Sequence, residues 1–233
     1  MQKHTLMHQD NMVTLFLFGD STCQTNLKDT YPQHGWGQVI EEYLNDGVRV
    51  INLARNGRST KSFITEERYE PALRNIKKGD FLFIQFGHND EKEDEARKTD
   101  PWTTYQDNLR FFISIARDVG ATPVLISSIY RRKFQDGKLI EKCHLEFPDA
   151  MEDLAKKENV IYVDGTKLTK DALNKLGEAE SRKLFMNFDP NIYENYPEGK
   201  VDNTHLRYEG AKFVCELIVP ELKKHPELAK LFK

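Results

Sequence analysis

A serine, an aspartate and a histidine stand in this chain where acyl-transfer chemistry could use them. Ser21 follows a mostly apolar run, residues 13–18, and the breaker Gly19. A buried strand that ends in a sharp turn would hold the Ser21 hydroxyl at a sheet edge, where open α/β sheets bind ligands. Taken alone, however, this stretch is better explained by a serine that caps the next helix.

Asp202 and His205 supply the other two groups of such a site. They are three residues apart, in a predicted turn just before the last predicted helix. A carboxylate this near can accept the Nδ1–H of the ring and fix its tautomer, which leaves Nε2 free to take a proton from a serine. Because a serine hydroxyl is a weak nucleophile, it needs such a base beside it.

Acyl transfer also needs donors for a negative oxygen, and two further turns could provide them. The tetrahedral intermediate is stabilised by fixed N–H groups. Gly57 and Asn89 follow the second and third predicted strands. The backbone N–H groups of Ser21 and Gly57 and the side-chain amide of Asn89 would then form an oxyanion hole. Glycine at position 57 suits a turn where the backbone approaches a ligand closely.

Strands and helices are predicted to alternate along the chain. The predicted strands are residues 13–18, 48–53, 80–86, 122–129 and 160–163. Helical spacing is seen in residues 35–44, 62–76 with a break at Pro71, 101–119, 146–158, 167–186 and 208–224. Residues 91–100 read as a solvated loop, 131–142 as an excursion with a hairpin at Asp136-Gly137, and 187–203 as a loop.

This alternation predicts the fold class. Five strands separated by helices imply a parallel sheet covered on both faces, with right-handed crossovers. The expected architecture is a three-layer α/β/α sandwich of the flavodoxin-like kind, in one domain over residues 1–233. Alternation leaves the order of the strands open. In a parallel sheet the turns at Ser21, Gly57 and Asn89 would share one edge.

Composition excludes several classes of function. The 233 residues carry a net charge of −3 with both signs interspersed, so no nucleic-acid or membrane partner is expected. No apolar run reaches transmembrane length, and residues 1–11 hold no secretory h-region. The three widely spaced cysteines argue against disulfides and for a reducing compartment. We therefore expect a cytoplasmic protein; its oligomeric state stays open.

Four short blocks, in chain order, resemble the blocks of the SGNH, or GDSL, hydrolases. They are Gly19-Asp20-Ser21, Gly57, Gly87-His88-Asn89-Asp90 and Asp202-x-x-His205. More narrowly, the chain resembles the rhamnogalacturonan acetylesterase branch. That likeness rests on Gly19-Asp20-Ser21-Thr22, Gly35-Trp36-Gly37, Asn56-Gly57-Arg58-Ser59, Glu67-Arg68-Tyr69-Glu70 and Phe86-Gly87-His88-Asn89-Asp90.

The resemblance implies serine esterase chemistry on an SGNH fold, with no metal or other cofactor. It assigns Ser21 as nucleophile, His205 as base and Asp202 as the group that orients the base. The expected substrate is a short acetylated pectic oligosaccharide. One alternative is an SGNH esterase for another acyl group, such as a thioesterase or lysophospholipase. Another is a non-catalytic flavodoxin-like module that binds an anion near Gly57.

Other residues are candidates for contact with a sugar. Arg58 and Arg68 could hold a substrate carboxylate, as galacturonate would require, or form surface ion pairs. His88 could contact the substrate or pack beside Asn89. Three aromatic side chains could stack on a sugar ring: Trp102, Tyr193 and Tyr196.

Several conspicuous residues are expected to be structural. Asp20 and Asp90 would brace turns by accepting backbone N–H groups, Trp36 would pack, and Cys215 would lie in the core. Cys23 follows the Ser21 turn but has no histidine beside it in sequence. No ligand spacing that would indicate a zinc site links the remaining histidines, His4, His8, His34, His144 and His225.

Overall fold

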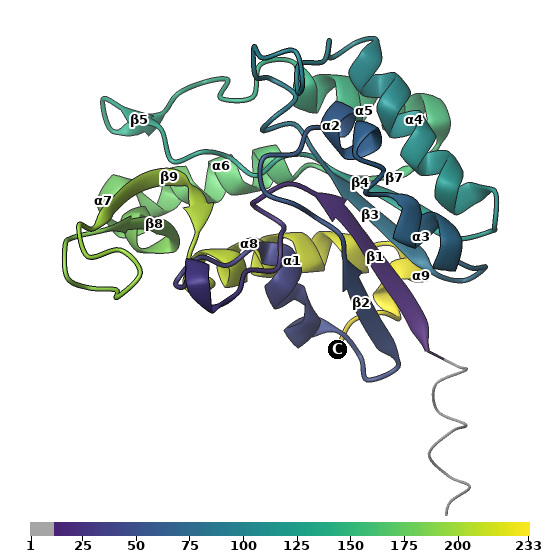
Figure 1. Cartoon of the computed structure of the whole chain (residues 1–233), viewed down its shortest axis with the longest axis horizontal. Coiled ribbons are helices and arrows are strands. Elements are labelled where there is room, and N and C mark those ends of the chain that lie inside the picture. Colours follow the sequence, from purple (N-terminus) through teal and green to yellow (C-terminus); the bar gives the residue numbers. More distant parts are fainter. Residues whose placement is uncertain (1–11) are drawn as a thin grey trace, which may run out of the picture.

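A five-stranded parallel sheet forms the centre of the computed structural model, which describes residues 12–233. Its strands lie in the order β2-β1-β3-β4-β7 (Figure 1). Their bounds are β1 (Val13–Gly19), β2 (Val48–Asn52), β3 (Phe81–Gln85), β4 (Thr122–Ile126) and β7 (Ile161–Val163). The predicted parallel sheet is confirmed, and the strand order is that of flavodoxin-like folds.

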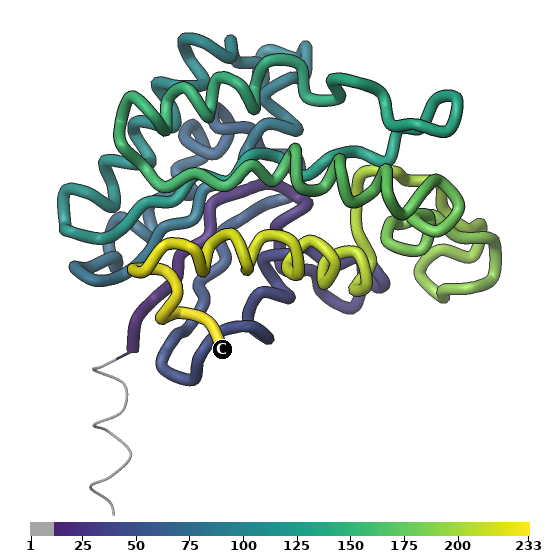
Figure 2. The backbone as a smooth tube through the Cα atoms, turned by 180° about the vertical axis from the view of Figure 1, so that it is seen from behind, coloured from purple at the N-terminus to yellow at the C-terminus, as the bar shows by residue number. Residues whose placement is uncertain are grey.

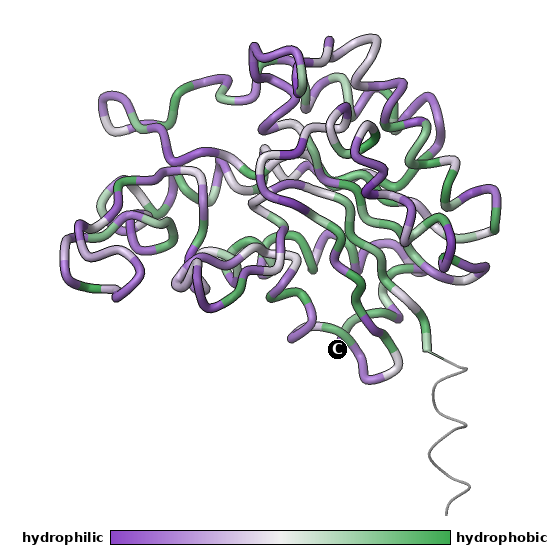
Figure 3. Tube along the Cα trace, in the orientation of Figure 1, coloured by the Kyte–Doolittle hydropathy of each residue, from purple (hydrophilic) through white to green (hydrophobic). Residues whose placement is uncertain are grey.

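Strand β1 shows why the sequence at its centre is continuously apolar. Leu15 and Leu17 belong to the core on one face of the sheet, whereas Phe16 and Phe18 belong to the core on the other face. Successive side chains of a strand point to opposite faces, so a strand that is covered on both sides is apolar at consecutive positions. Hydrophobic residues accordingly gather along the sheet (Figure 3).

Helices cover both faces of the sheet, and Figures 1 and 2 show the layers from opposite sides. One core includes residues of α1 (Trp36–Val39), α6 (Gly165–Leu176) and α8 (Tyr208–Lys223). The other includes residues of α2 (Thr60–Thr65), α3 (Glu70–Asn75), α4 (Thr104–Arg117) and α5 (Phe147–Glu158). The expected three-layer α/β/α sandwich is therefore confirmed.

Short elements complete the chain and refine two predictions. The expected helix over residues 62–76 is interrupted, because α3 begins anew with Pro71 in its first turn. The expected hairpin exists as β5 (Phe134–Gln135) and β6 (Lys138–Leu139), with positive φ at both turn residues. The remaining helices are η1 (Lys28–Thr30), η2 (Ile40–Tyr43), α7 (Glu178–Ser181), η3 (Arg182–Leu184) and α9 (Pro226–Ala229).

The prediction of a helix through residue 186, followed by a loop over residues 187–203, is wrong. Helix α6 ends at Leu176, before Gly177 with φ +84°. Strand β8 (Phe185–Phe188) then pairs antiparallel with strand β9 (Lys200–Leu206). This long-range pairing satisfies the backbone and buries the aromatic side chains of β8, which outweighs the local helical pattern. Asp202 and His205 consequently lie on a strand rather than in a turn.

The three cysteines are unpaired and buried, in agreement with the absence of a disulfide framework predicted from their spacing. Across residues 12–233, no helix is long and apolar enough to cross a membrane. The predictions about residues 1–11, including His4 and His8, fall outside the described residues.

Candidate active site

The Ser21 hydroxyl sits in a tight turn directly after β1, at the carboxyl edge of the sheet. The backbone N–H groups of Cys23 and Gln24 both donate to the carbonyl of Asp20, which closes the turn. The Asp20 side chain is buried and accepts hydrogen bonds from the backbone and hydroxyl of Thr22. Burial raises the pKa of Asp20, against the effect of these hydrogen bonds. Asp20 therefore braces the turn, as predicted.

Ser21, His205 and Asp202 form one hydrogen-bonded chain. His205 Nε2 lies 2.8 Å from Ser21 Oγ, and His205 Nδ1 lies 2.7 Å from Asp202 Oδ2. Burial alone would raise the pKa of Asp202, but the side chain and backbone N–H of His205 lower it well below its usual range. Asp202 is thus ionised and accepts the Nδ1–H, which leaves Nε2 to accept the serine proton.

Three donors lie near this chain. Gly57 occupies a turn closed by a hydrogen bond from Arg58 N to Arg55 O, and its φ of +75° is a conformation that favours glycine. The Asn89 side-chain amide donates to Arg58 O at 3.1 Å, which leaves its second N–H available. Within residues 12–233, the backbone N–H groups of Ser21 and Gly57 donate to no protein acceptor.

One cavity of about 360 Å³ brings these residues together. Its wall consists of Ser21, Asn56, Gly57, His88, Asn89, Lys92, Arg97, Arg131, Asp202, Thr204 and His205. None of these is Ala, Val, Leu, Ile, Met or an aromatic hydrocarbon residue, so the composition of the wall disfavours a long acyl chain. Every residue that the sequence assigned to nucleophile, base, orienter or oxyanion hole lines this cavity.

The cations of the wall were missed by sequence reasoning, which placed Lys92 and Arg97 in a solvated loop. Arg97 pairs with Asp94, and Arg131 pairs with Glu91; both carboxylates lie outside the set that lines the cavity. Lys92 has no ion-pair partner in the part of the chain that the structure describes. Lys92 and Arg97 lie in the loop that follows the block containing Asn89, which was their signal in the sequence, whereas nothing local marks Arg131.

Most of the proposed sugar contacts lie away from the cavity wall. Arg58 and Arg68 both pair with Glu66, so of their two predicted roles the structure shows the surface ion pair. Trp102 is exposed in the turn before α4. Tyr193 and Tyr196 pack around the ring of Phe188 near the end of β8. Of the residues proposed to contact substrate, only His88 lines the cavity.

His88 is a buried histidine with an unusual environment. The residue is 3% exposed, and neither ring nitrogen has a hydrogen-bond partner among residues 12–233. Its ring centre lies 4.4 Å from that of His144, close to perpendicular. Burial lowers the pKa of His88 strongly, and the charges of His144 and Arg131 add to this. His88 is therefore neutral, and its ring packs against that of His144 at the cavity wall.

The residues expected to be structural have that role. Asp90 accepts hydrogen bonds from Thr60 at the start of α2 and from Thr99. Trp36 is buried and donates from Nε1 to Gln85 at 3.0 Å. No group of three or more His, Cys, Asp or Glu side chains that could hold a metal ion occurs in the described range, residues 12–233.

The flavodoxin-like sheet, with a hydrogen-bonded Ser–His–Asp chain at its carboxyl edge, defines the class of protein as a three-layer α/β/α hydrolase. Residues 15–218 match the family model of the GDSL-like lipases and acylhydrolases, and the chain belongs to this family of carboxylic ester hydrolases.

Two curated relatives resemble most of the chain. The rhamnogalacturonan acetylesterase RhgT of Bacillus subtilis is 41% identical over 212 residues, which are 91% of this chain and 90% of that protein. The probable rhamnogalacturonan acetylesterase YesY of the same species is 36% identical, over 90% of this chain and 92% of that protein. These matches agree with the branch that the sequence blocks indicated.

Solved structures share the fold. The protein YXIM of Bacillus subtilis superposes with a TM-score of 0.74 at 24% identity, over 91% of this chain and 56% of that one. Axe2, an acetylxylan esterase from Geobacillus stearothermophilus, gives a TM-score of 0.62 at 14% identity, over 90% of this chain and 93% of that one. At these identities the likeness establishes the architecture alone.

Proposed function

We propose that this protein is a serine esterase that removes O-acetyl groups from pectic, rhamnogalacturonan-type oligosaccharides. The observation that carries the proposal is the 2.8 Å contact between Ser21 Oγ and His205 Nε2, with Asp202 on the other ring nitrogen. A hydroxyl paired in this way with an oriented imidazole is an activated nucleophile.

The reaction would run through an acetyl-enzyme. His205 Nε2 takes the proton of Ser21 as Oγ attacks the acetyl carbonyl, and the carbonyl oxygen becomes an oxyanion. The N–H groups of Ser21, Gly57 and Asn89 stabilise that oxyanion. The intermediate then collapses, and the sugar oxygen leaves with the proton from His205. A water molecule, deprotonated by His205, attacks the acetyl-serine and releases acetate.

The cavity wall supports both parts of the substrate assignment. The absence of aliphatic side chains favours a short acyl group over the long chain that a lysophospholipase would bind. Three cations line the cavity. Arg97 and Arg131 are paired with carboxylates outside the wall, whereas Lys92 has no such partner among residues 12–233 and leaves the wall cationic. A cationic wall favours a sugar that carries a carboxylate, as in pectic oligosaccharides. Lys92, rather than Arg58 or Arg68, would bind the carboxylate of the substrate.

Acetate release distinguishes the proposal from its alternatives. We expect release from acetylated pectic oligomers to exceed that from acetylated xylan and amino-sugar oligomers. Among p-nitrophenyl esters, acetate should be cleaved faster than octanoate; the reverse order would favour an esterase for long acyl groups. If the folded protein cleaves none of these compounds, an anion-binding module is the better description.

Ser21→Ala tests the mechanism itself. Loss of the nucleophile should lower turnover on the order of 10⁶-fold while the fold is kept, because the other groups of the triad act only through it. Far-ultraviolet circular dichroism and the melting temperature of the variant provide the control. Near-wild-type turnover in a clean preparation would overturn the proposed mechanism.

A further inference from the structure

Arg131 joins the two segments that carry the polar groups of the site. Its Nη1 donates to Thr204 Oγ1 at 2.8 Å, and Thr204 precedes His205 on β9. Its Nη2 donates to the carbonyl of His88 at 3.2 Å, and His88 precedes Asn89 in the loop after β3. One planar guanidinium thus connects the strand of the proposed base to the loop of a proposed oxyanion donor.

Behind Arg131 a buried chain of charges holds the guanidinium in place. Arg131 Nη2 also donates to Glu91 Oε1 at 2.7 Å, and Glu91 Oε2 lies 3.2 Å from His144 Nδ1. His144 Nε2 lies 2.8 Å from the carbonyl oxygen of Ile129. Because both ring nitrogens face acceptors, both carry a proton, and His144 is an imidazolium. The side chains of Arg131, Glu91 and His144 are 10, 11 and 0% exposed.

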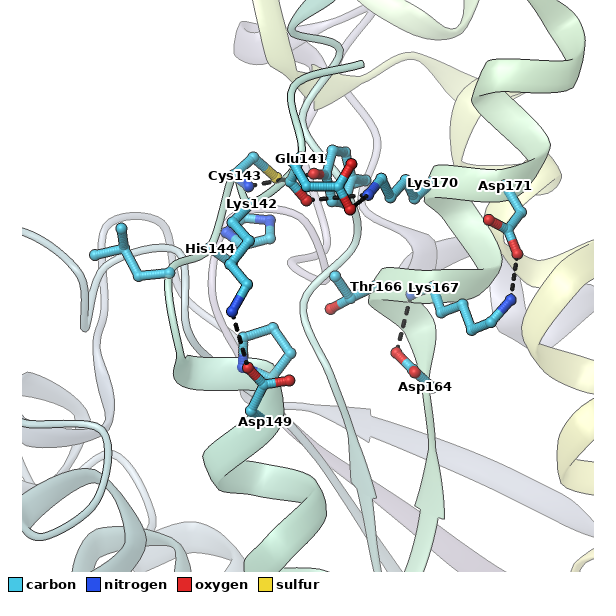
Figure 4. Close-up of a pocket in the computed structure, with 13 residues that line it drawn as sticks. Glu141, Lys142, Cys143, His144, Asp149, Asp164, Thr166, Lys167, Lys170 and Asp171 are labelled. Carbon is cyan, nitrogen blue, oxygen red and sulfur yellow. Dashed lines mark hydrogen bonds and ion pairs between the residues drawn. The ribbon is translucent and has the colours of Figure 1, made fainter. Parts of the chain in front are cut away.

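Among residues 12–233, Glu91 pairs with Arg131 and His144 and with no other cation. His144 also contacts the rings of His88 and Tyr130, at 4.4 and 6.1 Å between ring centres, and Cys143 precedes it in the chain. His144 also lines a second cavity, of about 310 Å³. The lysines of that cavity are paired with their own carboxylates (Figure 4). Glu91 therefore serves Arg131 and His144 alone among the cations described.

Burying three charges is costly, so the arrangement calls for a structural reason. Desolvation of a buried ion pair can exceed the attraction between its members, and such pairs are weak evidence for stability. What the guanidinium offers is geometry, since its donors form a rigid planar fork that is pre-organised for several acceptors at once. Here the acceptors are Thr204, His88 and Glu91.

We propose that Arg131 is a positioning residue: it sets the spacing between His205 and Asn89 by holding Thr204 and the His88 carbonyl on one guanidinium. The inference rests on the proposed esterase function, in which both groups act on the same acetyl carbonyl. A displacement of about 1 Å between such groups can lower the rate on the order of 10²-fold. In this role Arg131 acts through Thr204 and the His88 carbonyl and not by contact with the substrate.

Thr204→Val is the sharpest test, because it removes one acceptor and leaves the Arg131–Glu91 pair intact. We expect kcat for p-nitrophenyl acetate to fall about 10-fold at unchanged KM, with the melting temperature lowered by only a few degrees for the lost hydrogen bond. The matched control is Thr14→Val, which removes a threonine hydroxyl that accepts from Arg49 at 2.9 Å near the start of β1. The control should keep wild-type kcat.

Arg131→Met removes both connections and should lower kcat about 10²-fold at unchanged KM. Because Glu91 keeps its contact with His144, the variant should remain folded, and a melting temperature measured in parallel separates folding from positioning. Proton NMR adds a second readout. The His205 Nδ1–H, which is hydrogen-bonded to Asp202, should give a downfield resonance that is identified by its loss in Asp202→Asn. This resonance should shift or broaden in Arg131→Met.

Other outcomes would reject the inference. If folded Thr204→Val keeps kcat within about twofold of wild type, Arg131 does not position the site. A change in KM alone would make Arg131 a substrate contact, and a change in melting temperature alone would make it a purely structural residue. If Ser21→Ala retains turnover, the esterase proposal fails first; if Ser21 is essential but Thr204→Val is unaffected, only the role of Arg131 is lost.

Discussion

The carboxylate of Asp202 holds His205 at two points. Its Oδ2 lies 2.7 Å from the ring Nδ1, and its Oδ1 accepts the backbone N–H of His205 at 3.0 Å. Oδ1 also accepts the backbone N–H of Thr204 at 2.9 Å. Asp202 does not cap the final helix, since Arg207 occupies the N-cap of α8. One carboxylate therefore fixes both the backbone and the ring orientation of His205.

Asp202→Asn and His205→Ala test this relationship. His205→Ala should remove nearly all turnover, because Ser21 loses its base. Asp202→Asn should cost up to about 10⁴-fold, because an amide favours the wrong tautomer of the ring. The measurement is kcat for p-nitrophenyl acetate across the acid limb of the pH profile. An unchanged rate and limb in Asp202→Asn would reduce the site to a Ser21–His205 dyad.

Asn89→Ala tests the oxyanion hole. Removal of one donor should lower kcat by about 10²–10³-fold with little change in KM, because the oxyanion exists only along the reaction path. The Asn89 amide also donates to Arg58 O, so the melting temperature must be measured in parallel. A folded variant with wild-type kcat would show that the second N–H of Asn89 does not serve the reaction.

Lys92→Gln tests the selectivity of the cationic wall. The unpaired ammonium should favour acidic sugars, so KM for acetylated pectic oligomers should rise about tenfold, while p-nitrophenyl acetate should be unaffected. Lys98→Gln is the matched control: it makes the same change in the same loop, at a lysine that is paired with Glu93 away from this cavity. If Lys92→Gln affects the pectic oligomers and the neutral p-nitrophenyl ester equally, Lys92 does not recognise a substrate carboxylate.

Stability should depend on pH through His144. Burial lowers its pKa, but the side chains of Cys143 and Glu91 outweigh this and raise it from 6.5 to about 9. Because the folded protein binds this proton more tightly than the unfolded chain does, protonated His144 stabilises the fold by up to about 3 kcal/mol. This contribution is complete below pH 6.5 and is lost as the pH rises through 9. The free-energy difference between wild type and Glu91→Gln, from urea unfolding, should therefore shrink between pH 6.5 and 9.5. A constant difference would contradict a protonated His144.

The sequence by itself determined the fold class and the central residues of the site. Each of Ser21, Gly57 and Asn89 follows a strand whose apolar residues and flanking turn are visible locally. Because parallel strands end at one edge of a sheet, the sequence predicts the three turns at the same edge. The observed order places β1 between β2 and β3, so the three turns are neighbours. The spacing of Asp202 and His205 is likewise local, and their side chains pair at 2.7 Å on a strand as they would have in the predicted turn.

The tertiary structure decided the order of the strands, the pairing of β8 with β9 and the composition of the cavity wall. These depend on groups that are distant in the chain: Arg131 and Thr204 are 73 residues apart, and Arg131 and Glu91 are 40 apart. A charged side chain in a loop has the same sequence signature whether it pairs on the surface, as Arg58 does, or faces a cavity, as Lys92 does. Its partner is selected only when folding brings distant segments together, since ion pairs and hydrogen bonds act over a few ångströms.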